Sequence, residues 1–101
     1  MKTETLILVK QFCVSHDIDI TFITALQNFG LIEIIVVEEN QYLDPQQLKE
    51  VEKMIRLHYD LEVNLEGIDI ITNLLKRIEY LQTELVTAQN KLKLLDVIFT
   101  E

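Results

Sequence analysis

The chain has 101 residues, a length that supports one domain with a modest hydrophobic core. Hydrophobic residues make up 49% of the sequence, which excludes a disordered tail, and the net charge is −8. Two glycines and one proline are too few for the many turns of an all-β sandwich. We therefore expect a mainly α-helical protein.

Cysteine content and hydropathy narrow the class further. The single cysteine, Cys13, excludes an internal disulfide and suits a reducing compartment. No apolar segment approaches the roughly 20 residues that span a bilayer. The apolar run at residues 6–9 is too short for a secretory signal. These features predict a cytoplasmic protein that does not bind membranes.

The first thirty residues predict two short helices separated by a turn. Residues 6–16 form the first helix. Asp19 is suited to cap the second, because its carboxylate can accept a hydrogen bond from a free backbone N–H group of the first turn. Gly30 ends this second helix, since glycine adopts a positive φ at little cost. Two short helices joined by a three-residue turn predict a helix-turn-helix.

Residues 31–43 predict a small β-hairpin, or wing. Residues 31–37 are almost all β-branched or leucine, residues 38–40 are suited to a turn, and residues 41–43 return as a short strand. The alternative is a single buried strand followed by a loop, and the sequence alone leaves both open.

A third helix is predicted to begin at Asp44. This residue can accept hydrogen bonds from the first turn, and Pro45 follows where a missing N–H group is no loss. Gln47 stands where its side chain can reach back to the cap. The helix carries an apolar face that includes Val51, and it ends near residue 61.

The last third of the chain predicts one long helix, capped by Asn64 and beginning at Leu65. Its apolar residues recur at alternating steps of three and four, the spacing of the a and d positions of a heptad repeat. These positions are Ile71, Leu74, Ile78, Leu81, Leu85, Ala88, Leu92, Leu95 and Phe99. We expect a winged helix-turn-helix-like body over residues 1–63 and a long coiled-coil-like helix over residues 64–101, within one structural domain.

The order of these elements resembles the MerR-type winged-helix architecture. A narrower resemblance lies at Ile55-Arg56-Leu57-His58-Tyr59-Asp60-Leu61, followed by Val63-Asn64-Leu65-Glu66-Gly67-Ile68. This string runs directly into a leucine-rich helix and is similar to the CbpM family of chaperone modulators. The resemblance covers almost the whole chain. This chain has Ile34 where family members often have a proline, and Leu65 where they often have an aromatic residue.

The resemblance implies a function that composition does not reveal. Members of the CbpM family bind the J-domain of CbpA, a DnaJ-like co-chaperone, and inhibit both its co-chaperone activity with DnaK and its DNA binding. We expect the same class of partner for this chain. The residues expected at the contact surround the start of the long helix: they are Arg56, Asp60, Glu62, Glu66 and Asp69.

Charge argues against direct binding to nucleic acid. No lysine or arginine occurs between Lys10 and Lys49, so the second helix and the wing carry no basic residue. Affinity for duplex DNA depends on contacts between such residues and phosphates. The alternative, a MerR-like transcriptional regulator, requires basic residues that are absent here. The alternative interpretation of the acidic residues, which needs no partner, is that they keep a small protein soluble.

The heptad positions of the long helix predict self-association, and a homodimer is the expected form. The residues expected at this interface are Ile78, Leu81, Leu85, Leu92 and Leu95. A long partner-binding edge and a helix that folds back on its own domain are the alternatives. A plain dimerisation module is a further functional alternative.

Local pairs in the chain have structural interpretations. Arg56 and Asp60 have the i,i+4 spacing of a helical ion pair. Gly67 stands at the third position of the long helix, where we expect it to permit the close approach of another helix or of the partner.

Catalysis has little support in the sequence. Cys13 and His16 fall on one helical face, but a third group and oxyanion donors are lacking, so we expect Cys13 to be a buried structural residue. His16 and His58 are the only histidines, too few for a zinc site, and no glycine-rich phosphate loop occurs. We expect no enzymatic activity, no catalytic residues, no metal and no cofactor.

Overall fold

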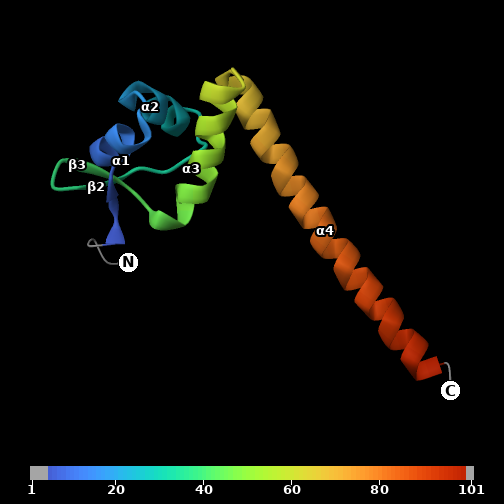
Figure 1. The fold of residues 1–101 in the computed structure, drawn as a ribbon. Coiled ribbons are helices and arrows are strands. Elements are labelled where there is room, and N and C mark those ends of the chain that lie inside the picture. The colour runs from blue at the N-terminus through green and yellow to red at the C-terminus, as the bar shows by residue number, and fades with distance from the viewer. Residues whose placement is uncertain (1–4, 100–101) are drawn as a thin grey trace. The chain divides into compact units, whose positions relative to one another are not determined.

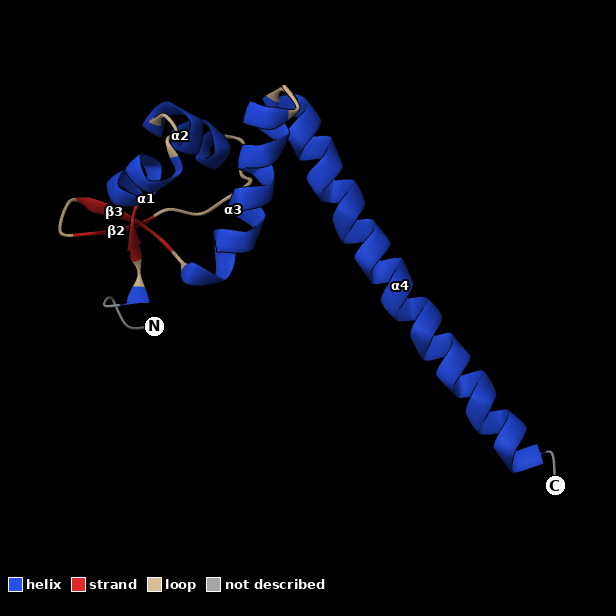
Figure 2. Ribbon diagram, viewed as in Figure 1, coloured by secondary structure: helices blue, strands red, loops and turns tan. Residues whose placement is uncertain are grey.

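The computed structural model describes residues 5–99 of the chain (Figures 1 and 2). The chain forms two compact units, residues 1–69 and residues 70–101, and their boundary falls inside the last helix. The elements in chain order are β1 (Ile7–Leu8), α1 (Val9–His16), α2 (Ile20–Asn28), β2 (Ile35–Val37), β3 (Asn40–Leu43), the 3₁₀ turn η2 (Pro45–Gln47), α3 (Leu48–Ile55), the π turn η3 (Arg56–Asp60) and α4 (Leu65–Phe99). The mainly helical class, the small sheet and the long last helix confirm the predicted fold.

The first helix begins later than the sequence predicted. Its start is Val9 rather than residue 6, because Ile7 and Leu8 pair with β3 as a short antiparallel strand. Ile7 lies opposite Leu43 in this pairing. The strand order is therefore β1-β3-β2, with the hairpin extended by a third strand. Two residues are too few to show the alternation that reveals a strand in a sequence.

The ends of α2 follow the prediction. Asp19 caps the start, since its Oδ1 accepts a hydrogen bond from the Thr21 N–H group at 3.0 Å. At the other end Gly30 has a φ of 76°. Its N–H group donates to the Gln27 carbonyl, and the Leu31 N–H group donates to the Leu26 carbonyl. This pair of hydrogen bonds forms a Schellman motif, which satisfies carbonyl groups that the helix leaves free.

The predicted wing is present as a two-residue hairpin. Val37 of β2 lies opposite Asn40 of β3, so Glu38 and Glu39 alone make the turn. Both glutamates have positive φ values, 49° and 67°. A type I′ turn needs this conformation, which matches the twist of the strands but favours asparagine and glycine over glutamate. The turn geometry is thus kept at a cost in backbone strain.

Asp44 is the predicted cap, but it caps the 3₁₀ turn η2, and the α-helix α3 begins only at Leu48 without a side-chain cap. Asp44 accepts a hydrogen bond from the Gln46 N–H group at 3.0 Å. Gln47, however, does not reach back to this cap. Its side-chain amide accepts from the Glu33 N–H group at 2.9 Å and donates to the Glu33 carbonyl at 3.0 Å. The Gln47 side chain therefore joins η2 to the segment before β2. It can do so because the N–H and C=O groups of Glu33 are both available to it.

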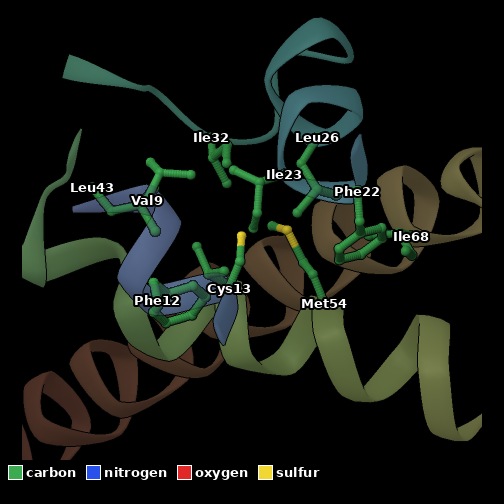
Figure 3. Packing of buried hydrophobic residues seen from close by; sticks show 11 residues of the cluster. Val9, Phe12, Cys13, Phe22, Ile23, Leu26, Ile32, Leu43, Met54 and Ile68 are labelled. Carbon is green, nitrogen blue, oxygen red and sulfur yellow. The ribbon is translucent and has the colours of Figure 1, made fainter. Parts of the chain in front are cut away.

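The core of the first unit draws side chains from the helices and strands around it (Figure 3). Its buried members are Val9, Phe12, Cys13, Phe22, Ile23, Leu26, Ile32, Leu43, Val51, Met54 and Ile68. Each aliphatic side chain of this size gains about 1.5–3 kcal/mol from leaving water. Ile68 comes from the first turns of α4 and is fully buried. The beginning of the long helix is thereby part of the body.

We expect the double substitution Glu38→Asn/Glu39→Gly to stabilise the protein, because asparagine and glycine adopt positive φ with less strain than glutamate. The free energy of unfolding in urea should rise by about 1–2 kcal/mol. Glu38→Gln/Glu39→Gln is the matched control, since it removes the same charges and keeps the strain. Equal stability of the two variants would contradict the assigned turn strain.

Candidate partner-binding surface

The predicted partner-binding residues lie around the chain reversal between α3 and α4. Here α3 widens into the π turn η3, in which the Leu61 N–H group donates to the Arg56 carbonyl at 3.2 Å. The Val63 N–H group then donates to the Leu57 carbonyl at 2.9 Å. Glu62 takes a φ of 56°, which turns the chain back toward the start of α4. π turns of this kind are rare and often occur at functional sites.

His58 holds this reversal together. Its Nδ1 lies 3.0 Å from the Val63 carbonyl oxygen. A carbonyl oxygen only accepts, so Nδ1 carries the proton and donates. The His58 ring also stacks on Phe22 of α2, with 4.6 Å between ring centroids and 18° between planes. One side chain therefore links the reversal to the helix-turn-helix.

Tyr59 joins the same cluster from the surface. Its ring meets Phe22 and His58 edge to face, at centroid distances of 5.4 Å and 5.0 Å. Its hydroxyl oxygen accepts a hydrogen bond from the Asp19 N–H group at 3.3 Å. The start of α2 and the π turn are therefore direct neighbours. This contact joins residues that are 40 positions apart, so no local sequence pattern predicts it.

Most of the predicted contact residues are exposed, and all lie between residues 56 and 69. Arg56 and Asp60 are exposed in η3, Glu62 is exposed after it, and Glu66 is exposed in the first turn of α4. Asp69 is half-buried one turn later. The structure thus carries all five on one short stretch of the first unit. Whether they contact a partner stays a prediction.

The predicted helical ion pair between Arg56 and Asp60 does not form. Within residues 5–99, no ion pair joins the two side chains. The i,i+4 alignment belongs to an α-helix, and the π turn changes the angular spacing of the residues it contains. Both side chains are exposed to solvent, and they do not contact each other as an ion pair.

Gly67 serves a different contact from the one predicted. Asn64 caps α4, and its Oδ1 accepts from the Gly67 N–H group at 2.8 Å. A Cβ atom added to Gly67 would lie 2.6 Å from Val63 Cγ1 and 3.1 Å from Asn64 Oδ1. The close approach that glycine permits thus comes from the preceding residues of its own chain. Within the described part of the chain no other helix makes this close approach, and a partner at this position stays a prediction.

The surfaces that MerR-like architectures would offer to DNA are uncharged or acidic. The exposed polar side chains of α2 are Thr21, Thr24, Gln27 and Asn28. The tip of the wing is Glu38-Glu39. Neither element carries a basic side chain that could neutralise a phosphate.

Cys13 lies on α1, and its side chain is buried in the core, as predicted. Burial, and secondarily the carboxylate of Asp19, raises the pKa of the Cys13 thiol. A thiol in this state is a poor nucleophile. The nearby His16 is engaged elsewhere: its Nδ1 donates to the Phe12 carbonyl at 3.1 Å, and its Nε2 lies 3.2 Å from Glu52 Oε2. The pair therefore does not form a nucleophile and its base.

No group of three or more histidine, cysteine, aspartate or glutamate side chains is arranged to hold a metal ion within residues 5–99. Over the same residues, no helix is both long and apolar enough to cross a membrane. A shallow cavity of about 340 Å³ lies beside the segment after α2. Its lining includes Gly30, Glu33, Asp44 and Gln47, and it contains no histidine or cysteine.

The second unit consists of the greater part of α4. The side chains predicted for self-association are all strongly exposed in the single chain, with exposed fractions between 49% and 66%. These are Ile78, Leu81, Leu85, Leu92 and Leu95. A single helix gains its stability mainly by packing an apolar face, and this face is uncovered in the single chain. Self-association through it stays a prediction.

A helix-turn-helix followed by a β-hairpin wing and a long last helix defines a winged helix-turn-helix protein. A family model described as "MerR HTH family regulatory protein" matches residues 7–90, most of the chain. The chain belongs to this family. Comparisons with curated proteins and with solved structures find no match.

We expect Gly67→Ala to destabilise the protein by about 1–3 kcal/mol, because the new Cβ would collide with Val63, whose branched side chain has little rotamer freedom. In an otherwise free helix position the same change would stabilise by about 1 kcal/mol. Urea unfolding of Gly67→Ala, Val63→Ala and the double variant measures the coupling. If Gly67→Ala costs as much in the Val63→Ala background, the contact with Val63 is not the reason for glycine.

Proposed function

We propose that this protein is a non-enzymatic member of the MerR family that acts by binding another protein. The partner we propose is the J-domain of a CbpA/DnaJ-like co-chaperone. By covering that domain, the protein would inhibit both the action of the co-chaperone with DnaK and its binding to DNA.

The observation that carries this proposal is the lack of any lysine or arginine from residue 11 to residue 48. This interval contains the whole of α2 and the wing. A DNA-reading protein needs cations on these elements to contact phosphates. The same interval carries acidic residues, which suit a basic protein surface. J-domains characteristically present a basic helix to DnaK.

A second line of support is the segment Ile55–Ile68, where the CbpM resemblance is narrowest. It includes Arg56, Asp60, Glu62 and Glu66, all exposed, and the half-buried Asp69 follows it directly. Complementary charge across an interface speeds encounter and fixes orientation, whereas buried apolar groups supply most of the affinity. A carboxylate-rich surface facing the basic helix would therefore compete with DnaK for it.

The first test is a titration of the whole protein against a purified CbpA-type J-domain at low and high salt, with a DNA duplex titrated in parallel. We expect micromolar or tighter binding to the J-domain that weakens as salt rises, and no comparable affinity for DNA. Absence of J-domain binding in either salt would overturn the proposal. Tight DNA binding would instead favour a transcriptional regulator.

The same titration with Asp60→Asn/Glu66→Gln tests the location of the contact. We expect about tenfold weaker binding and a smaller salt dependence. The matched control is Glu38→Gln/Glu39→Gln, which changes the net charge equally at the tip of the wing. Equal weakening by both variants would mean that overall charge, rather than the surface at residues 56–69, drives association.

We also propose that the protein is a homodimer through the heptad face of α4. Leu85→Glu places a charge at an a position, where burial in a dimer would be costly, and should give monomers in sedimentation equilibrium. Thr83→Glu, at an exposed position off the heptad seam, is the control and should leave the dimer intact. A monomeric wild-type protein at micromolar concentration would contradict the proposal.

A further inference from the structure

We propose that Tyr59 and Leu61, together with Ile20 at the start of α2, form the apolar anchor on which the partner's basic helix docks. This inference rests on the proposed function and names the surface and the chemistry that would carry it. The anchor lies entirely in the first unit, where α2 meets the π turn.

Exposed apolar side chains mark this surface. Leu61 is 67% exposed, Tyr59 43% and Ile20 36%. Single exposed apolar residues are normal in soluble proteins, and the first unit has others, such as Val14 on α1. These three differ because they belong to two segments in direct contact. The Asp19 N–H group donates to the Tyr59 hydroxyl, which joins residues 17–20 to residues 59–62.

The acidic side chains around the anchor favour a partner surface with positive charge. The two joined segments carry Asp17, Asp19, Asp60 and Glu62, all exposed, and the π turn adds one cation, Arg56. An apolar centre with a charged rim is the usual anatomy of a protein interface. The complement is an amphipathic helix with an apolar face bordered by lysine and arginine, docked helix-in-groove or helix-on-surface.

Tyr59 is held in place before any partner arrives. Its ring contacts Phe22 and His58, and its hydroxyl is fixed by the Asp19 N–H group. A side chain that is already ordered loses little conformational entropy on binding. Rigid tyrosines near the centre of an interface are frequent hot spots. Leu61 lies in the loop that follows. It offers exposed apolar area to a partner and is not a member of the buried core.

The decisive experiment compares Leu61→Ser with Val14→Ser. Both changes remove an exposed apolar side chain from the first unit, and Val14 lies outside the two joined segments at 83% exposure. The full-length variants and the wild type are titrated against a purified CbpA-type J-domain, and stopped-flow measurements give association and dissociation rates. Urea unfolding checks that both variants are as stable as the wild type.

We expect Leu61→Ser to raise Kd about tenfold or more, mainly through faster dissociation, and Val14→Ser to bind like the wild type. Asp60→Asn/Glu62→Gln should instead slow association and flatten its salt dependence. Tight binding by Leu61→Ser would overturn the anchor while the proposed function stood. Failure of the wild type itself to bind would overturn the proposed function, and the anchor with it.

Discussion

The chain reversal between α3 and α4 is held to the rest of the first unit by one aromatic ring. His58 stacks on Phe22 of the helix-turn-helix and donates to the Val63 carbonyl across the π turn. This pair of contacts sets where the chain reverses, and therefore where Asn64 caps the long helix. It also fixes the entry of Ile68 into the core. Without the ring, the reversal would lose the His58 side-chain hydrogen bond and the stacking on Phe22 together, and its backbone hydrogen bonds and the Tyr59 contact would remain.

Features with local causes were predictable from the sequence, and features with distant causes were not. The caps at Asp19, Asp44 and Asn64 were predicted, because a capping side chain bonds to residues two or three positions away. The partner of Gln47 lies 14 residues back, and that prediction was wrong. The Tyr59 contact, 40 residues away, could only come from the tertiary fold.

Family membership and surface chemistry answer different questions here. The MerR family is shown by a match over most of the chain, and the helix-turn-helix with its wing agrees with it. A fold does not determine a function, which depends on the groups presented at the surface. On α2 and the wing those groups are uncharged or acidic, and basic side chains are absent. The architecture of a DNA reader is thus combined with a surface that would repel phosphate.

Among residues 5–99, every non-glycine residue with positive φ is acidic: Asp17, Glu38, Glu39 and Glu62. Glycine or asparagine would relieve most of this strain. A selection for thermostability alone would therefore tend to replace these residues and strip charge from the surface. Heat-stable variants that lose Asp17 or Glu62 should consequently be enriched in weak binders, because stability and charge compete at these two positions of the proposed surface.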